Sequence, residues 1–551
     1  MKRISLLLIT AGLSLTLSAQ KATSRIDRAL TIYNDVLRQL DISYADTLNY
    51  EDLLNTSIHQ MLRKTDPYTV YMPEDKTSDL KFMTTGKYGG IGAVIMQRTD
   101  GKGNTYVVVS NPYEGMPAQR HDVRAGDRIL EVDGKNVSGK GTPEVSQLLR
   151  GTPHSTVTLR LKREGQDKPI TRSFEREEIK ISPVEYATAL PSPRGEKPTG
   201  YVSFTEFTEG SADLFSETVD NMVKNEGIGS LVIDLRGNGG GIIDEAVKIV
   251  GLFVEKGTEV VSTKGKTPQS CRTYRTPIEP RWKEMPIAVI VDHNSASAAE
   301  IVAGSLQDLD RAVIIGTRTY GKGLVQSIRP IAHNGHLKVT TSKYYIPSGR
   351  CIQAIDYSKR RADGSVERVP DSLTHEFRTR LGRIVRDGGG IEPDILMEDS
   401  QKVDITYALY SKNLFFDYAT RYRLLHDTIA PAAEYSVSDE DLEDFIGFLK
   451  EKQFSYETET GKYMKDLIDM ARHEDLDSTL LADLKQLEER LTPPFEEVVR
   501  HKAAEVKNFM GQEIISRYYY NKGVVIYNLR TDKELERAVA ELSKTEGESK
   551  E

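Results

Sequence analysis

Cysteine is scarce in this chain, and long apolar runs are scarcer still. Cys271 and Cys351 are the only cysteines among 551 residues. Their pairing cannot be read from sequence, so a disulfide and two free buried thiols both stay open. The single long apolar run lies near the N-terminus, where it is expected to be a cleaved signal peptide. Since no second long apolar run follows, we expect no integral membrane anchor. A hydrophobic fraction of 38% and a charged fraction of 28% exclude collagen-like and wholly disordered compositions.

The first twenty residues have the order of a secretory signal peptide. Lys2 and Arg3 precede the apolar run Ile4–Leu17, and small residues follow up to Ala19. The run is interrupted by polar residues and is shorter than the roughly 20 apolar residues of a membrane span. We expect cleavage near Ala19 and a soluble exported protein, periplasmic or extracellular. Loss of the two basic residues changes the formal charge from -8 to about -10, which disfavours a nucleic-acid partner.

The length predicts three or four domains, and the hydrophobic patterns predict their order. After the signal peptide, residues 1–19, helical spacing predicts a helical region over residues 20–85. Short β-type runs with glycine-rich turns predict a β-rich domain over residues 86–180. Strands that alternate with helices predict a layered α/β domain over residues 181–400. Charged helical patterns fill residues 401–551, whose role the sequence does not reveal.

A glycine-rich turn runs into a predicted strand at the start of the β-rich domain. Its residues are Gly89, Gly90, Ile91 and Gly92. Successive backbone N–H groups in such a turn can hold the terminal carboxylate of a peptide, while the strand edge pairs with the peptide backbone. The segment Ala125–Gly134 resembles the turn and strand of bacterial PDZ domains. An ordinary β-turn in an unrelated β domain is the alternative.

Two further glycine-rich turns invite a nucleotide-binding interpretation, and each departs from its motif. Arg236–Gly241 lies between a predicted strand and a predicted helix, where backbone N–H groups can bind a phosphate or a developing oxyanion. Ile242 occupies the third glycine position of the dinucleotide fingerprint. Gly316–Gly323 fits a phosphate-binding loop up to Lys322, but a glycine and then a strand follow, where a hydroxyl residue and a helix are required.

Ser297 follows the apolar segment Ile287–Val291, which predicts a strand. With Glu300 it has the spacing of a capping box, and simple helix capping would explain both residues. A nucleophilic role is compatible with a cap, because a serine at a helix N-terminus lies beside unsatisfied N–H groups and the positive end of the helix dipole. The residues alone leave capping and catalysis open.

A nucleophilic serine needs a base, and two residues qualify. His293 lies four residues before Ser297, and histidine is the most frequent general base. Lysine serves instead when burial lowers its pKa toward neutrality, and Lys322 stands between two glycines in a largely uncharged stretch.

Several short motifs resemble those of the carboxyl-terminal processing (tail-specific) serine peptidases with a PDZ domain, in their residues, their order along the chain and their spacing. They are Gly90-Ile91-Gly92, Asp234–Gly240, Ser295–Glu300, Gln307-Asp308 and Tyr320–Gln326, within a resemblance that covers about residues 25–400. The resemblance implies a Ser-Lys dyad with Ser297 as nucleophile, Lys322 as base and Gln326 as the residue that orients Lys322. Lys322 follows Ser297 by 25 residues and Gln326 follows Lys322 by 4, as the family pattern requires.

The family also implies an oxyanion hole from the Ser297 N–H and a glycine of the Asn238–Gly240 turn, which we predict to be Gly239. Family members usually have Asn-Pro-Gly-Gly where this chain has Asn238-Gly239-Gly240-Gly241. Asp308 matches an acidic position of the family, and we expect it to be structural. The implied fold is a multidomain α/β protein whose crotonase/Clp-like layered α/β catalytic core carries an inserted-type β-rich PDZ domain and helical N- and C-terminal regions.

The resemblance implies an exported serine endopeptidase that recognises free C-terminal tails of protein or peptide substrates and works through an acyl-enzyme. We expect no cofactor and no metal: no His-Glu-x-x-His segment occurs, and His333 and His336 lack an evident third ligand. A catalytically inactive PDZ scaffold that only binds peptide tails is the alternative, which the joint presence of Ser297, Lys322 and Gln326 disfavours. Homo-oligomer formation, the physiological substrate and the preferred cleavage site stay open.

Overall fold

The computed structural model describes residues 25–74, 82, 84–191, 197–361, 365–397 and 405–544. The predicted signal peptide lies outside these residues. The chain divides into two compact units, the described parts of Met1–Met72 with Ile328–Val339 and of Pro73–Ser327 with Thr340–Glu551. Among the described residues, no helix combines the length and the apolar character that crossing a membrane requires.

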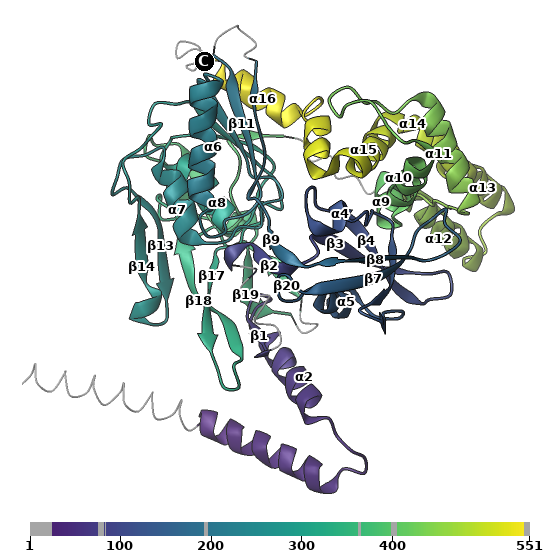
Figure 1. The fold of residues 1–551 in the computed structure, drawn as a ribbon, viewed down its shortest axis with the longest axis horizontal. Helices are drawn as coiled ribbons and strands as arrows, with labels where there is room; N and C mark the ends of the chain where they lie inside the picture. Colours follow the sequence, from purple (N-terminus) through teal and green to yellow (C-terminus); the bar gives the residue numbers. More distant parts are fainter. Residues whose placement is uncertain are drawn as a thin grey trace, which may run out of the picture. The chain divides into compact units, whose positions relative to one another are not determined.

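The first unit is mainly helical, as the spacing predicts (Figure 1). It contains a helix over residues 25–43 and α2 (Tyr50–Leu62), which Asn49 caps by accepting a hydrogen bond from the Asp52 N–H at 3.2 Å. β1 (Val70–Met72) pairs antiparallel with the start of β18 (His336–Tyr345). The turn before β18 has positive φ at His333 and Asn334, and the Ile331 N–H donates to the Gly335 carbonyl at 2.9 Å.

A small β domain begins the second unit. Its main sheet has the order β3-β4-β5-β7-β8, with β6 beside β5, so β3 is an edge strand whose free side can accept another chain. β2 pairs with β9 outside this sheet. The elements are β2 (Lys87–Gly90), β3 (Ala93–Thr99), β4 (Thr105–Pro112), α4 (Pro117–Arg120), β5 (Arg128–Val132), β6 (Lys135–Asn136), α5 (Thr142–Leu149), β7 (Thr156–Lys162), β8 (Ile170–Glu175) and β9 (Glu177–Lys180).

The central α/β region is built on a six-stranded sheet of order β10-β11-β12-β15-β16-β23, parallel except for β10. Its central strands β11, β12 and β15 are buried on both faces, which explains continuous apolar runs such as Ile287–Val291. Helices α6, α7 and α8 share one hydrophobic cluster with one face of the sheet. The elements are β10 (Val184–Leu190), β11 (Thr199–Phe204), α6 (Ser211–Asn225), β12 (Ser230–Asp234), α7 (Ile243–Gly251), β15 (Ile287–Val291), α8 (Ala298–Asp308), β16 (Val313–Gly316) and β23 (Ile395–Leu396).

Further strands of this region lie outside the six-stranded sheet. β13 pairs with both β14 and β18, β17 pairs with β18, and two short hairpins, β19-β20 and β21-β22, follow. Cys271 is exposed and Cys351 is half-buried, and both thiols are free. The elements are β13 (Glu259–Gly265), η2 (Pro268–Ser270), β14 (Arg272–Arg275), β17 (Leu324–Pro330), β19 (Ile355–Arg360), β20 (Val366–Arg368), η3 (Asp371–Leu373), β21 (Glu376–Arg378) and β22 (Ile384–Arg386).

The C-terminal region is helical and has its own aromatic-rich core, which includes Phe415, Tyr418 and Phe445. Its last helix, α16, packs on the face of the α/β sheet opposite α6, α7 and α8. The helices are α9 (Ile405–Ser411), α10 (Leu414–Leu425), α11 (Asp439–Glu451), α12 (Glu459–His473), α13 (Ser478–Leu491), α14 (Phe495–His501), α15 (Ala503–Asn528) and α16 (Lys533–Leu542).

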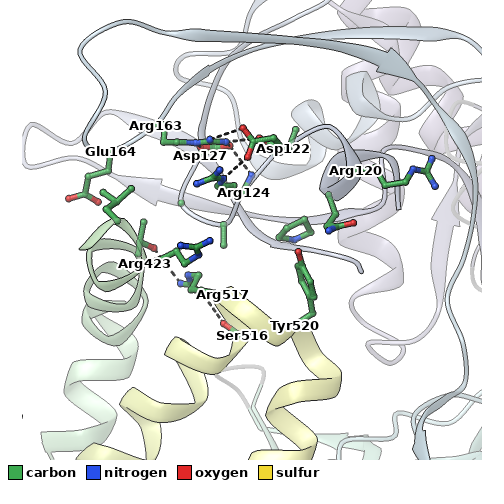
Figure 2. Close-up of a pocket in the computed structure, with 17 residues that line it drawn as sticks. Arg120, Asp122, Arg124, Asp127, Arg163, Glu164, Arg423, Ser516, Arg517 and Tyr520 are labelled. Atoms are coloured by element: carbon green, nitrogen blue, oxygen red, sulfur yellow. Dashed lines mark hydrogen bonds and ion pairs between the residues drawn. The ribbon is translucent and has the colours of Figure 1, made fainter. Parts of the chain in front are cut away.

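The β domain and the helical region meet through charged groups. Arg98 on β3 forms a bidentate ion pair with Asp417 on α10, at 2.5 and 2.9 Å. Nearby, a cavity of about 250 Å³ has Arg124 and Arg163 on the β-domain side and Arg423 and Arg517 on the helical side (Figure 2). α15 is kinked beside this cavity, at Tyr520, whose φ of 54° is left-handed.

Candidate active site

Ser297 lies at the sharp turn between β15 and α8. Its φ of 56° is left-handed, an unfavourable conformation that non-glycine residues hold mainly at functional sites. The Ser297 side chain makes no capping hydrogen bond, although Glu300 has the predicted capping-box position. The hydroxyl is therefore not used to start the helix, and Ser297 is half-buried at the positive end of α8.

Glu300 connects the serine turn to the lysine loop. Its side chain is fully buried, and its Oε2 accepts hydrogen bonds from the Ser297 N–H at 2.8 Å and from the Lys322 N–H at 2.9 Å. Its Oε1 accepts from the Thr319 hydroxyl at 2.6 Å and from the Gly321 N–H at 2.7 Å. Burial raises the pKa of Glu300, while these four donors favour the ionised form and oppose the rise.

Tyr344 on β18 makes a second connection between the same two segments. Its hydroxyl donates to the Ser297 carbonyl oxygen at 3.2 Å, and its backbone N–H donates to the Gly323 carbonyl at 3.0 Å. Burial, and next the charge of Glu300, raise the pKa of Tyr344 well above its usual value, so the hydroxyl stays protonated. The peptide groups on both sides of Ser297 are thus fixed by buried side chains.

Lys322 and Gln326 lie where the sequence predicts a loop and a strand, rather than the helix that a nucleotide-binding loop requires. Lys322 is half-buried between β16 and β17, and Gln326 is on β17. The Gln326 side-chain amide donates to the Thr340 hydroxyl on β18 at 3.2 Å. Gln353 holds the loop from the other side, by accepting the Gly323 N–H at 2.7 Å.

The glycine turn after β12 lies directly against the serine turn. The Ala296 N–H donates to the Asn238 carbonyl at 2.9 Å. Gly240 has a φ of +99°, and a Cβ at this position would lie 2.8 Å from the Ser297 Cβ and 2.7 Å from the Ala296 oxygen. Only glycine fits there without displacing the backbone that carries the serine.

The N–H groups of this turn are not equally available. The Gly240 N–H donates to the Asn238 side chain at 2.9 Å, and the Gly237 N–H donates to the Asp292 carboxylate at 3.0 Å. The Gly239 N–H has no hydrogen-bond partner within the described part of the chain, and Gly239 is exposed with open space at its Cα. Of the two predicted oxyanion donors, the Gly239 N–H is therefore available to a ligand, whereas the Ser297 N–H donates a hydrogen bond to Glu300.

His293 and Asp308 have surroundings unlike those of Lys322. His293 is exposed, and its ring accepts or donates a hydrogen bond at 3.1 Å with Asn294. Asp308, at the end of α8, is buried against Arg350 at 2.8 Å and accepts the Ser348 N–H at 2.9 Å. These contacts agree with the structural role expected for Asp308.

The predicted peptide-binding turn differs in detail from its expected form. Gly89 and Gly90 belong to β2 and pair with Glu178 and Glu177 of β9, so the turn itself is Ile91-Gly92. Gly92 has a φ of +70°, and a Cβ there would lie 2.4 Å from the Met116 Cβ. The turn leads into β3, whose free edge lies beside α5.

A β domain with an open edge strand, joined to an α/β core in which a strained serine faces a glycine turn and a lysine loop, defines a PDZ-containing serine peptidase. Residues 108–163 match a PDZ domain, residues 198–358 match Peptidase family S41, and residues 405–542 match "Probable PDZ-protease, C-terminal helical domain". The chain belongs to peptidase family S41 and carries a PDZ domain. The predicted multidomain α/β fold class is thereby confirmed.

The chain is similar to several named proteins. The "Carboxy-terminal-processing protease" of Bartonella bacilliformis is 35% identical over 349 residues, which cover 62% of this chain and 77% of that protein. A "Probable CtpA-like serine protease" of Staphylococcus aureus is 32% identical over 334 residues, 60% of this chain and 64% of that protein. Among solved structures, the photosystem II D1 C-terminal processing protease is 26% identical and covers 66% of this chain and 86% of its own, with a TM-score of 0.37.

Proposed function

We propose that this serine peptidase cleaves proteins that it selects by their free C-terminal tails, using a dyad of Ser297 and Lys322. The observation that carries the dyad is the shared acceptor: the backbone N–H groups of both residues donate to Oε2 of Glu300. The serine turn and the Gly321-Lys322 loop are thus supported by one buried carboxylate, although Lys322 follows Ser297 by 25 residues along the chain.

In this mechanism the Ser297 hydroxyl attacks the scissile carbonyl while the neutral Lys322 amine takes its proton. Lys322 returns the proton to the leaving amine, and water then hydrolyses the acyl-enzyme by the same route. We propose that Gln326, which is on β17, orients the Lys322 side chain. The positive end of α8 favours the negative charge that develops beside Ser297.

The oxyanion of the tetrahedral intermediate is proposed to bind the N–H groups of Gly239 and Ser297. Gly239 supports this role because its N–H is uncommitted and exposed beside the serine turn. The Ser297 N–H must share or leave its hydrogen bond to Glu300 when the oxyanion forms. Tightening of a loose resting arrangement upon substrate binding is common for catalytic hydrogen bonds.

Tail selection is proposed to occur at the PDZ domain. A peptide strand would pair with the free edge of β3, and its carboxylate would lie at the start of that strand, beside Ile91 and Gly92. The pattern from Lys2 to Ala19 supports export, so we propose that the substrates are encountered outside the cytoplasm.

The test is digestion of an unfolded protein that ends in an apolar residue with a free carboxylate. Wild-type protein should cleave it, and Ser297→Ala should leave it intact while still binding a fluorescent tail peptide. Cleavage by folded Ser297→Ala at the wild-type rate would refute the nucleophile. Tail binding without cleavage by the wild type would favour the scaffold alternative.

A further inference from the structure

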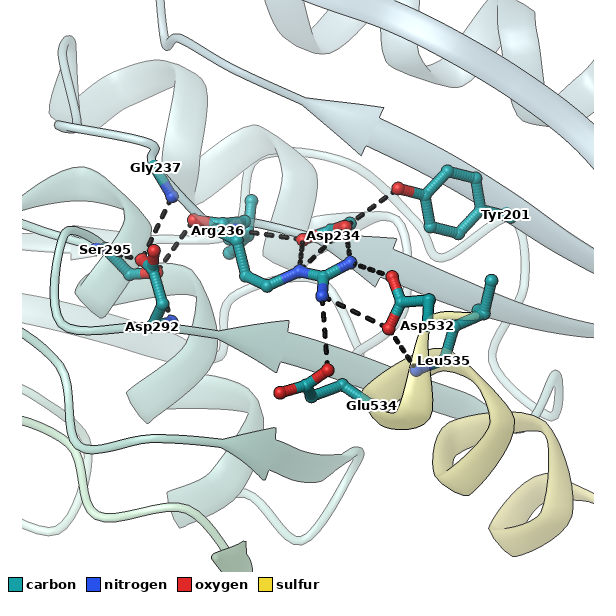
Figure 3. A network of polar contacts seen from close by, with 10 residues as sticks. Tyr201, Asp234, Arg236, Gly237, Asp292, Ser295, Asp532, Glu534 and Leu535 are labelled. Atoms are coloured by element: carbon teal, nitrogen blue, oxygen red, sulfur yellow. Dashed lines mark hydrogen bonds and ion pairs between the residues drawn. The ribbon is translucent and has the colours of Figure 1, made fainter. Parts of the chain in front are cut away.

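Arg236 links the glycine turn of the catalytic core to the last helix of the chain (Figure 3). Its guanidinium donates to the Asp234 carboxylate, with the shortest distance 2.6 Å, and to both oxygens of Asp532 at 3.2 and 2.5 Å. Burial acts to lower the pKa of Arg236, but the charges of Asp234 and Asp532 outweigh it and the net shift is upward. Glu534 of α16 also lies 3.5 Å from this guanidinium. Arg236 is therefore a permanently charged link between Asp234 of the core and the first turn of α16.

Both carboxylates that bind Arg236, Asp532 on α16 and Asp234 on β12, are themselves fixed by hydrogen bonds. Asp532 is the N-cap of α16 and accepts the Leu535 N–H at 2.9 Å, and its side chain is only 6% exposed. On the core side, the Tyr201 hydroxyl donates to Asp234 at 2.8 Å. Bidentate geometry between two fixed carboxylates gives the guanidinium little freedom to move.

The residue after Arg236 begins the turn that faces the nucleophile. The Gly237 N–H donates to Asp292, and the Ser295 hydroxyl donates to the Leu235 carbonyl at 2.7 Å. Arg236 therefore lies between two backbone positions that are tied to the serine turn (Figure 3). A displacement of Arg236 would be passed directly to Gly237 and onward to Gly239.

α16 is held on the sheet by apolar contacts that do not depend on this ion pair. Leu535, Ala538 and Val539 are buried in one cluster with Val232 and Ile290 of β12 and β15. Loss of the Asp532 charge would therefore leave the helix docked, with the hydrophobic cover of the sheet intact. The polar contact and the apolar contact can be separated by mutation.

We propose that Asp532 is a positioning residue for catalysis, which holds Arg236 so that the Gly237–Gly240 turn presents its oxyanion donor to Ser297. The C-terminal helical region then supports the active site directly, in addition to covering the sheet. This inference rests on the oxyanion role proposed above for Gly239.

The experiment uses Asp532→Asn and Asp532→Ser in the full-length protein. Both substitutes are good N-caps, so α16 keeps its start, but asparagine has no charge and serine is too short to reach Arg236. We expect kcat to fall by about ten-fold or more, with KM and the affinity for a fluorescent tail peptide within about two-fold of wild type. Labelling of Ser297 by a fluorophosphonate, whose tetrahedral adduct needs the same oxyanion donors, should slow in parallel, and Asp532→Glu should recover part of the rate.

The matched control is Glu443→Gln, which breaks another bidentate pair of the helical region, with Arg500 at 2.8 Å, far from Arg236 in the chain. It should leave kcat and labelling unchanged. Wild-type kcat and labelling rates in folded Asp532→Ser would overturn the inference while leaving the dyad intact. A wild-type protein that does not cleave the tail substrate, or a folded Ser297→Ala protein that cleaves it at the wild-type rate, would instead show that the proposed function itself is wrong.

Discussion

Ser297 and Lys322 share one hydrogen-bond acceptor: their backbone N–H groups donate to the same oxygen of the buried Glu300, at 2.8 and 2.9 Å. A carboxylate has about four acceptor positions, and Glu300 uses four donors. A glutamine in its place would turn an NH2 group toward two of these donors. The serine turn and the lysine loop would then lose their common support.

Glu300→Gln should therefore lower kcat by at least about ten-fold, because an unmade buried hydrogen bond costs about 1–3 kcal/mol and two are affected. KM for a tail substrate should change little, since the PDZ domain is untouched. The measurement is steady-state cleavage together with fluorophosphonate labelling of Ser297. Glu392→Gln, which removes an exposed carboxylate 3.3 Å from Arg318, is the control. Full activity in a folded Glu300→Gln protein would show that the shared acceptor is dispensable.

The assignment of the base predicts opposite results for substitutions of Lys322 and of His293. Lys322→Arg keeps the positive charge but cannot deprotonate, so it should be inactive, as should Lys322→Ala. His293→Ala should keep most of the activity, because His293 is exposed and bonded to Asn294. Initial cleavage rates are compared after circular dichroism has shown that each variant is folded. If His293→Ala is inactive while Lys322→Arg is active, the Ser-Lys dyad is wrong and a Ser-His mechanism is favoured.

Much of the α/β core could be predicted from sequence because buried parallel strands give continuous apolar runs. The strand Ile287–Val291 was predicted with its exact ends, and the strand after Lys322 was predicted correctly from its apolar residues. These are local signals, so no tertiary information was needed.

The features that the sequence did not predict depend on long-range contacts. Nothing in the spacing of Ser297 and Glu300 indicates that the glutamate also accepts from Lys322, because that contact crosses the fold. The pairing of Asp532 with Arg236 spans 296 residues and has no periodic signal. Gly89 and Gly90 were expected in a turn, but pairing with β9 draws them into a strand despite the low β propensity of glycine.

Substitutions in the glycine turn can separate the loss of a hydrogen-bond donor from the steric effect of an added side chain. Gly239→Pro removes the N–H, whereas Gly239→Ala keeps the N–H and has open space for its methyl group. Family members with Asn-Pro-Gly-Gly have no N–H at this position and must take an oxyanion donor from another residue, so the prediction is specific to this chain, in which the Gly240 N–H is bound to the Asn238 side chain. We expect Gly239→Ala to be active and Gly239→Pro to lose about 10²-fold or more in kcat. Gly240→Ala should be inactive for a different reason, because its Cβ would displace the Ser297 backbone. A fully active Gly239→Pro would move the oxyanion donor to another residue.

Recognition of a free tail predicts sensitivity to charge at the substrate's C-terminus. Amidation removes the carboxylate, so the amidated substrate should be cleaved more slowly, with the change in KM rather than in kcat. Gly92→Ala should have the same effect on the free-acid substrate, since the left-handed Gly92 leaves no room for a Cβ beside Met116. The comparison needs matched peptides and initial rates. Equal rates for amide and acid would rule out tail selection at this turn.

Asp122 of the PDZ domain predicts how acid affects that domain. Partial burial acts to raise the pKa of Asp122, but hydrogen bonds from Arg172, Arg124 and Arg163 outweigh it and lower the pKa to about 2. The pKa in the unfolded chain is about 3.9, so the folded state favours the ionised form. The resulting stabilisation is complete above about pH 4 and is lost as the pH falls through 2.

Asp122→Asn should therefore destabilise the PDZ domain at pH 7, and the difference from wild type should shrink as the pH approaches 2. The Asp122 side chain is 41% exposed, so solvent screening limits the expected effect to about 1 kcal/mol or less. The measurement is the urea concentration at which the PDZ strands lose protection in pulsed hydrogen exchange, after equilibration at pH 7, 4 and 2.5 and labelling at one common pH. Asp167→Asn, at an exposed position of the same domain, is the control. A difference between wild type and Asp122→Asn that is independent of pH would mean that the arginine contacts act through packing rather than through the charge of Asp122.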